Sequence, residues 1–205
     1  MLINVVAKDP DLRVIEKIIK ILNNDGLIVI PTDTIYAFAI SMKSKKGLER
    51  LAKIKKIKLK NAKFSLICQD LKEISSYTKP FDRKTFKALK NALPGPFTFI
   101  LNANNSVSKI FNSNKKEIGI RIPNHKFIKT LIKELNHPLI CSSVNDKDEI
   151  VKYTTDPLVI FENYENNVDA VIDYGYGKNV ASTVVDCTSE KLVIIRQGAG
   201  EIYNV

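Results

Sequence analysis

The chain has 205 residues, of which 44% are hydrophobic and 26% are charged, and its formal net charge at pH 7 is +10. This length suits one domain with a substantial core or at most two small ones, and the ample aliphatic content argues against a disordered chain. No apolar run approaches the roughly 20 residues of a membrane span, and residues 1–8 lack the pattern of a signal peptide, so we expect a cytoplasmic protein with no membrane partner.

The first half of the chain alternates between helix-like and strand-like patterns. Asp9 as N-cap and Pro10 in the first turn predict a helix, whose apolar stripe ends before Gly26. Apolar runs predict strands over residues 27–30, 64–68 and 97–101. Helices are predicted around residues 47–54, 70–77 and 82–93, the last ending at Pro94.

The second half contains more strands than helices. We predict strands over residues 118–122, 139–142, 168–172, 183–186 and 193–196, and helices over residues 124–135 and 157–164. Residues 102–117 and 146–155 are polar, and we expect mobile loops there. Because the last strands lack intervening helices, the predicted fold class is α/β with a twisted mixed sheet and packed helices, in a single domain over residues 1–205.

The positive charge by itself favours an anionic partner such as a nucleotide, RNA or a membrane surface, although a solvated lysine surface imposed by genome composition would give the same total. Six lysines fall in the eleven residues from Lys53 to Lys63, and such a run repels itself unless something negative lies against it. The three cysteines lie in apolar runs with no CxxC spacing, which indicates buried reduced thiols at Cys68, Cys141 and Cys187.

Arginine is scarce, at 5 of the 32 basic residues, yet it occupies the ends of two apolar runs. Arg121 lies in Ile-Gly-Ile-Arg-Ile-Pro, and Arg196 lies in Val-Ile-Ile-Arg-Gln-Gly. The planar guanidinium binds carboxylate or phosphate through two hydrogen bonds, which an ammonium cannot copy. Both residues are therefore candidates for anion binding, the alternative being two ordinary strand-end arginines.

Familiar phosphate and metal motifs are absent. The sequence has no GxxxxGK[ST], GxGxxG or GxSxG, and neither histidine is spaced for a metal site with a cysteine. Any phosphate must therefore be held by side chains, and no metal site in the protein is predicted. Polar groups do follow predicted strands, where α/β folds bind ligands, although each could be a local turn or cap. These are Thr32-Asp33-Thr34, Ser142-Ser143-Val144-Asn145 and Ser182-Thr183.

Six segments in this order resemble the YrdC-type family of threonylcarbamoyl-AMP synthases over nearly the whole chain. They are residues 31–36, 94–101, 118–123, 142–145, 182–186 and 196–198. The resemblance implies a YrdC-like α/β domain around a deep basic cavity. It also implies the condensation of L-threonine, bicarbonate and ATP to threonylcarbamoyl-adenylate and pyrophosphate, for threonylcarbamoyladenosine modification of tRNA.

The resemblance also assigns roles by motif position. Thr32, Arg121 and Ser182 would bind threonine, with Arg121 on its carboxylate. ATP would be bound, together with Mg²⁺ on its phosphates, by Lys56, Ser143, Asn145 and Arg196. Lys56 and Lys58 are the catalytic candidates. We expect Thr32, Lys56, Arg121, Ser143, Asn145, Ser182 and Arg196 to line one cavity.

The chain departs from the family pattern at Lys58, where the family has Arg, and at Lys63-Phe64-Ser65, where it has Lys-Pro-Leu. Residues 61–71 resemble the YciO branch of the family, whereas Asn145, which that branch tends to lose, is retained. Two alternatives therefore stay open: a non-catalytic protein that binds double-stranded RNA or tRNA, and a carbamoyl-transfer relative acting on another substrate. Since 205 residues leave no room for the extra domain of longer synthases, transfer to tRNA would require separate proteins.

Overall fold

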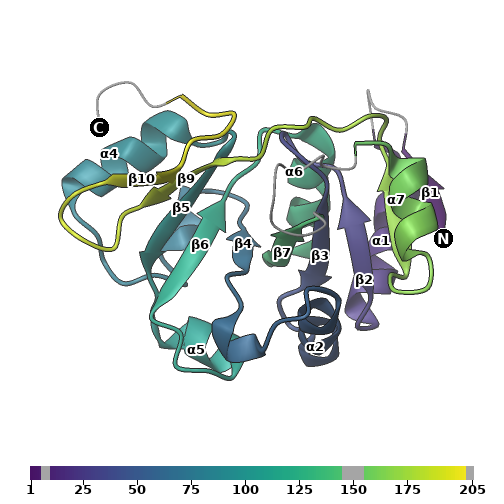
Figure 1. Ribbon diagram of the computed structural model, residues 1–205, viewed down its shortest axis with the longest axis horizontal. Helices are drawn as coiled ribbons and strands as arrows, with labels where there is room; N and C mark the ends of the chain where they lie inside the picture. The colour runs from purple at the N-terminus through teal and green to yellow at the C-terminus, as the bar shows by residue number, and fades with distance from the viewer. Residues whose placement is uncertain (6–9, 145–154, 202–205) are drawn as a thin grey trace.

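The computed structural model describes residues 1–5, 10–144 and 155–201, and in these residues ten strands form one mixed sheet (Figure 1). The strands are β1 (Leu2–Asn4), β2 (Leu27–Ile30), β3 (Ala37–Ser41), β4 (Ser65–Ile67), β5 (Phe97–Asn102), β6 (Glu117–Arg121), β7 (Leu139–Ser143), β8 (Ala170–Asp173), β9 (Thr183–Asp186) and β10 (Val193–Arg196). Their order is β1-β8-β2-β3-β7-β4-β6-β5-β9-β10. The sheet combines parallel pairs such as β4 with β6 and antiparallel pairs such as β5 with β6, which confirms the predicted mixed α/β sheet.

The helices connect strands that are often distant in the sheet. They are α1 (Leu12–Asn23), α2 (Lys45–Ile54), the 3₁₀ helix η1 (Leu59–Asn61), α3 (Leu71–Ile74), α4 (Arg83–Ala92), α5 (Asn105–Phe111), α6 (Lys126–Leu135) and α7 (Pro157–Tyr164). In Figure 1, α4 lies with β9 and β10 at one end of the molecule, whereas α1, α7 and β1 lie at the other. The strand β4 lies between these two groups.

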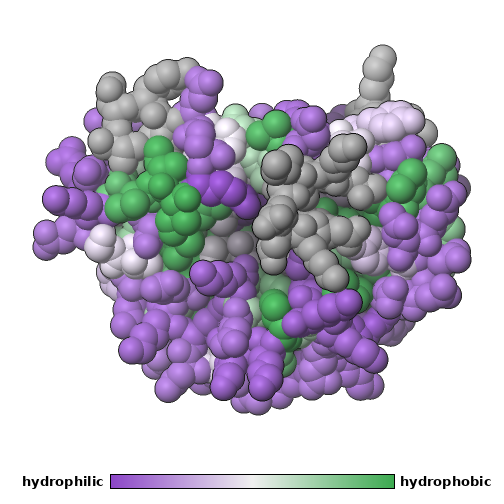
Figure 2. Space-filling model, viewed as in Figure 1, coloured by the Kyte–Doolittle hydropathy of each residue, from purple (hydrophilic) through white to green (hydrophobic). Residues whose placement is uncertain are grey.

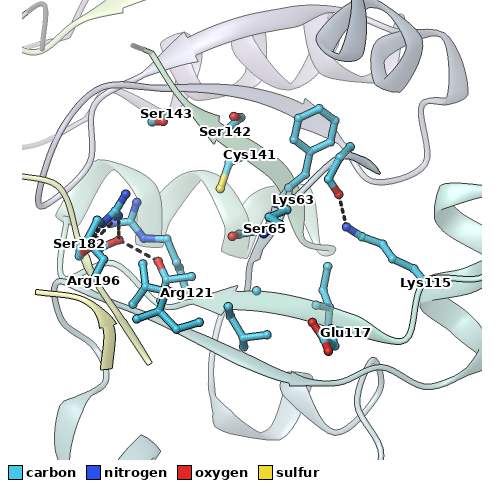
Figure 3. A pocket seen from close by; sticks show the side chains of 18 of the residues that line it. Lys63, Ser65, Lys115, Glu117, Arg121, Cys141, Ser142, Ser143, Ser182 and Arg196 are labelled. Carbon is cyan, nitrogen blue, oxygen red and sulfur yellow. Dashed lines mark hydrogen bonds between the residues drawn. The ribbon is translucent and has the colours of Figure 1, made fainter. Parts of the chain in front are cut away.

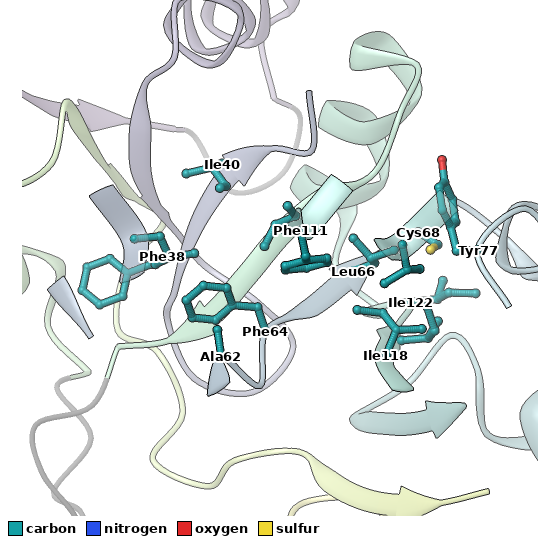
Figure 4. Packing of buried hydrophobic residues seen from close by; sticks show 14 of the residues in the cluster. Phe38, Ile40, Ala62, Phe64, Leu66, Cys68, Tyr77, Phe111, Ile118 and Ile122 are labelled. Carbon is teal, nitrogen blue, oxygen red and sulfur yellow. The ribbon is translucent and has the colours of Figure 1, made fainter. Parts of the chain in front are cut away.

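Two apolar clusters cover the two faces of the sheet. Alternate residues of β2 divide between them, since Ile28 belongs to the cluster with α1 and α6, and Val29 to the cluster with α2 and α7. All four residues of β2 are consequently buried, as expected for a central strand covered on both faces. The second cluster extends along the sheet through Leu66 of β4 to Phe111 of α5 (Figure 4).

Several predicted element boundaries differ from the structure. Asp9 lies outside the described residues, but α1 is capped by Asp11, whose carboxylate accepts a hydrogen bond from the Arg13 backbone N–H at 2.9 Å, so the N-cap prediction was wrong. Pro10 accordingly precedes the cap rather than occupying the first turn. The predicted helix over residues 70–77 is only the four-residue α3. The strands β1 and β3 were not predicted.

The prediction of a mobile loop over residues 102–117 was also wrong. Asn104 caps α5 by accepting from the Ser106 N–H at 2.9 Å, and Val107 and Phe111 are fully buried. This one-turn spacing of two apolar residues is enough to dock a short helix on the core. The predicted loop at residues 146–155 lies, except for Thr155, outside the described residues.

The cysteine prediction is confirmed, since Cys68, Cys141 and Cys187 are buried free thiols. Among the helices of the described ranges, none is long and apolar enough to cross a membrane.

Candidate active site

A cavity of about 790 Å³ lies against β4, β5, β6, β7, β9 and β10 (Figure 3). This volume is in the range of small-molecule binding sites. Its described lining includes two acidic residues, Glu117 and Asp186, and six basic ones: Lys60, Lys63, Lys115, Lys116, Arg121 and Arg196. An excess of positive charge in a concave site concentrates anionic ligands.

Arg121, at the end of β6, is held by the loop that follows β2. Its Nη2 donates to Asp33 Oδ1 at 3.0 Å and to Thr34 Oγ1 at 2.9 Å, and the Arg121 and Asp33 side chains are only 7% and 8% exposed. Asp33 Oδ2 also accepts from the Asn124 backbone N–H at 2.9 Å. The buried carboxylate therefore fixes the guanidinium, and the Arg121 Nε–H has no partner among the described residues.

Thr32 supports this arrangement from behind the cavity wall. Its Oγ1 donates to the Ile35 carbonyl at 2.6 Å, and it lies 3.1 Å from Thr34 Oγ1. Thr32 does not line the cavity. It is linked to Arg121 through Thr34. The expectation that Thr32 lines the site with Arg121 is wrong, and its role in threonine binding stays a prediction.

Arg196 and Ser182 lie at the same end of the cavity as Arg121. Arg196 donates to the Ser182 carbonyl from Nε at 3.2 Å and from Nη2 at 2.8 Å. Ser182 Oγ in turn lies 2.8 Å from Thr98 Oγ1. We call the group Arg121, Ser182 and Arg196 the arginine end of the cavity. The structure thus brings together two arginines that lie 75 positions apart in the sequence.

Backbone packing holds Arg196 against Ser182. The hydroxyl of Thr183 accepts from the Gly198 N–H at 2.9 Å and donates to the Gly200 carbonyl at 2.6 Å. A Cβ on Gly198 would lie 2.3 Å from the Ala181 carbonyl oxygen, so only glycine permits this approach.

The lysine run contributes different residues from those predicted. Lys56 and Lys58 do not line the cavity, which corrects the expectation for Lys56. Lys56 has a positive φ of 52° in the turn after α2, and Lys58 directly precedes η1. Lys60 and Lys63 do line it.

Ser143 also lines the cavity, and Asn145 lies outside the described residues. Lys55, which sequence reasoning missed, donates from Nζ to the Ser143 carbonyl at 3.2 Å. Cys141 lines the cavity beside Ser142, and burial raises the pKa of its thiol to about 11. The thiol is therefore protonated at neutral pH and is a poor nucleophile.

A second group of charges, also missed from the sequence, lies at the opposite end of the cavity in Figure 3. Lys115 Nζ donates to the Ala62 carbonyl and lies 4.8 Å from the centroid of the Phe111 ring. Burial lowers the pKa of Lys115 to about 8, an effect that Glu117 opposes and Lys63 adds to. The pair Lys115-Lys116 directly before a strand was the available sequence signal, but it fell within the stretch expected to be a loop.

The chain matches the Sua5/YciO/YrdC family model, described as "Telomere recombination", over residues 20–198. An "Uncharacterized protein" of Haemophilus influenzae is 34% identical over 194 residues, covering 94% of this chain and 93% of that protein. A "Threonylcarbamoyl-AMP synthase" of Coxiella burnetii is 30% identical over 131 residues, covering 64% of this chain and 70% of that protein.

Solved structures agree with these sequence relationships. E. coli YciO superposes with a TM-score of 0.86 at 29% identity, covering 98% of this chain and 97% of that one. P. abyssi Sua5 complexed with L-threonine superposes with a TM-score of 0.86 at 21% identity, covering 97% of this chain and 57% of that one, and at this identity it shows the fold alone. The family model spans most of the chain, and the first relative is similar along almost all of it. The chain belongs to the Sua5/YciO/YrdC family.

Proposed function

We propose that the protein condenses L-threonine, bicarbonate and ATP to threonylcarbamoyl-adenylate, pyrophosphate and water. The observation that carries the proposal is the convergence of Arg121, Ser182 and Arg196 on one basic cavity. The name of the Coxiella burnetii relative and the threonine bound to P. abyssi Sua5 support the substrate assignment.

Arg121 is the group proposed to bind the threonine carboxylate. Two of its five N–H groups are used by Asp33 and Thr34, and Nε is buried without a partner in the described part of the chain. The guanidinium therefore keeps donors for a ligand while its position is fixed from behind. Ser182, beside it, would accept or donate one hydrogen bond to the same amino acid.

Arg196 and Ser143 are the groups proposed to contact ATP. The carbamate formed on the threonine amine attacks the α-phosphorus, a new P–O bond forms, and the bond to pyrophosphate breaks. Negative charge on the phosphoryl oxygens and the departing pyrophosphate has to be balanced, and fixed cations in a closed site do this better than water. Asn145 is proposed to take part with them.

Mg²⁺ is proposed to arrive with ATP rather than to occupy a site of the protein. Within residues 1–5, 10–144 and 155–201 no three His, Cys, Asp or Glu side chains are grouped to hold a metal. This fits Mg²⁺, which is commonly bound by substrate phosphates and one or two carboxylates, and Glu117 and Asp186 are the carboxylates in the lining. The ion would neutralise part of the phosphate charge.

The test is an assay of adenylate and pyrophosphate formation from ATP by the purified protein, with threonine and bicarbonate each omitted in turn. Formation that requires both supports the proposal. ATP turnover independent of threonine would instead favour a carbamoyl-transfer relative with another substrate. No turnover, with no binding of ATP or threonine, would refute the assignment.

The RNA-binding alternative is favoured by one observation, the lysines outside the cavity. Lys53, Lys56 and Lys58 are exposed, and hydrophilic side chains dominate the face in Figure 2. If these lysines bind RNA, affinity falls steeply with salt, and Lys58→Gln weakens it as much as Lys63→Gln. If the cavity binds ATP, Lys63→Gln weakens ATP binding more than Lys58→Gln, because only Lys63 lines the cavity.

A further inference from the structure

Residues 174–182 connect β8 to β9, and we call them the crossing segment. In the sheet, β8 is the second strand and β9 the ninth, so the segment passes seven strand spacings, roughly 33 Å along the sheet. The ten Cα–Cα steps from Asp173 to Thr183 reach at most about 36 Å. Figure 1 shows the segment in yellow-green, running from the side of α7 along the upper edge of the molecule to β9. Because the segment has few residues to spare, a contact that fixes its first half also restricts the place of its end.

The last two residues of the crossing segment, Ala181 and Ser182, line the cavity. The Ala181 carbonyl accepts from the Ala199 N–H at 2.8 Å, and the Ser182 carbonyl accepts two hydrogen bonds from Arg196. Arg196 Nη2 also lies 3.3 Å from Ser182 Oγ. The position of Ser182 relative to Arg121 therefore depends on where the crossing segment ends.

Tyr36 holds the first half of the crossing segment. Its hydroxyl donates to the Gly175 carbonyl at 2.7 Å and accepts from the Tyr174 N–H at 3.3 Å. The residue is only 1% exposed, and burial raises the pKa of its hydroxyl to about 12, so the hydroxyl remains a donor at neutral pH. A Cβ on Gly177 would lie 2.8 Å from Cδ2 of the Tyr36 ring, so the segment lies directly against the ring because residue 177 is glycine.

The loop that positions Arg121 also contacts the crossing segment. The Thr34 carbonyl accepts from the Lys178 N–H at 3.1 Å, while Thr34 Oγ1 accepts from Arg121 Nη2. The Tyr36 carbonyl accepts from the Val144 N–H at 3.0 Å, directly after β7. This short stretch of chain therefore connects the crossing segment with Arg121 and with the end of β7, although Tyr36 itself does not line the cavity.

We propose that Tyr36 is a positioning residue, which fixes the crossing segment and thereby holds Ser182 beside Arg121 at the arginine end of the cavity. The contacts of Tyr36 define this role, whereas the identity of the ligand, L-threonine, rests on the proposed function. Tyr36 lies outside the cavity lining, so its effect on a bound amino acid passes through Ser182.

The experiment is calorimetric titration of the full chain with L-threonine, for the wild type, Tyr36→Phe, Ser182→Ala and the double variant. Phenylalanine keeps the buried ring against Gly177 and removes only the hydroxyl. We expect Tyr36→Phe to bind threonine roughly three- to tenfold more weakly, and this loss to disappear in the Ser182→Ala background. The control is Tyr77→Phe, which removes the hydroxyl of another buried tyrosine outside the cavity lining and should bind threonine as the wild type does.

A purely structural role for Tyr36 would give a different result. Equal losses from Tyr36→Phe in the wild-type and Ser182→Ala backgrounds would overturn the proposal, as would wild-type threonine affinity in Tyr36→Phe. Gly177→Ala tests the same contact from the other side, because its Cβ would push the crossing segment away from the Tyr36 ring. It should also weaken threonine binding, and this loss should likewise disappear in the Ser182→Ala background.

Amide hydrogen exchange without any ligand separates this proposal from the proposed function. Tyr36→Phe should speed exchange of the Lys178 N–H roughly three- to tenfold, because the crossing segment opens more often, whereas Tyr77→Phe should leave it unchanged. Faster exchange in Tyr36→Phe, together with a wild type that binds no threonine, supports the role of Tyr36 and refutes the proposed function. Unchanged exchange refutes the role of Tyr36 alone, whether or not the protein forms adenylate.

Discussion

Replacing Asp33 with asparagine tests the view that a buried carboxylate positions Arg121. The two side chains form an ion pair of 3.0 Å at 8% and 7% exposure, and Asp33 also accepts from the Asn124 N–H. Removing one partner of such a pair leaves the other as an uncompensated buried charge, which costs about 3–5 kcal/mol. The asparagine oxygen can still accept one hydrogen bond, so we expect a smaller loss, about 2 kcal/mol.

For a chain of this size, about 2 kcal/mol lowers the melting temperature by roughly 4–8 °C. The control is Lys46→Gln, which removes an exposed ion pair with Asp25 whose N–O distance is 3.9 Å and should change stability by less than about 0.5 kcal/mol. A double-mutant cycle of Asp33→Asn with Arg121→Gln should show a coupling energy, because the two side chains are in direct contact. Asp33→Asn should also raise the KM for threonine.

The reasoning fails if Asp33→Asn costs no more stability than Lys46→Gln, or if the cycle shows no coupling. A stability loss with an unchanged KM for threonine would keep the structural role and refute the link to threonine binding. The melting curve and the KM are separate measurements, so a variant that is folded at the assay temperature gives both.

Three further predictions concern the rest of the cavity. Arg196→Ala should weaken ATP binding roughly ten- to hundredfold, whereas Arg83→Ala, at an exposed position of α4, should leave it unchanged, as measured by equilibrium titration; equal effects would refute the phosphate role. Gly198→Ala should lower the melting temperature and ATP affinity together, because its Cβ would lie 2.3 Å from the Ala181 carbonyl oxygen; a normal melting curve contradicts this. Cys141 should resist iodoacetamide at pH 8 in the folded protein and react in urea, as followed by mass spectrometry, because burial raises its pKa to about 11; rapid labelling of the native protein would show that the thiol is accessible.

Strands made of continuous apolar runs were predictable, whereas elements that depend on tertiary packing were not. The buried run of β2 was predicted at its observed bounds, Leu27–Ile30, because few other structures accommodate four consecutive aliphatic residues between a helix and a proline. The helix α5 is mostly polar and is stabilised by burying Val107 and Phe111 in a core built by distant strands. The local sequence of α5 therefore resembles that of a loop, and the helix was not predicted.

The same distinction applies to the candidate site. Arg121, Ser182 and Arg196 could be identified because arginine is scarce and because their neighbours follow a family pattern in order. Asp33 was visible only as part of a polar turn, since its pairing with a residue 88 positions away depends on the fold. Lys115 was hidden for the same reason, because its partner Ala62 lies 53 positions earlier.

Which lysines of the run from Lys53 to Lys63 line the cavity could not be predicted from the sequence. Four lysines of this run are the same residue type and lie two or three positions apart, yet only the last two of them line the cavity: Lys56, Lys58, Lys60 and Lys63. The left-handed turn at Lys56 and the short helix η1 determine this division, and neither has a distinctive sequence signal. Charges inside the cavity are placed to bind a small anion and those outside it an extended one, so the division separates the proposed enzyme from the RNA-binding alternative. Substitutions at Lys58 and Lys63, which differ in position but not in charge, can therefore distinguish two functions that the net charge of +10 cannot.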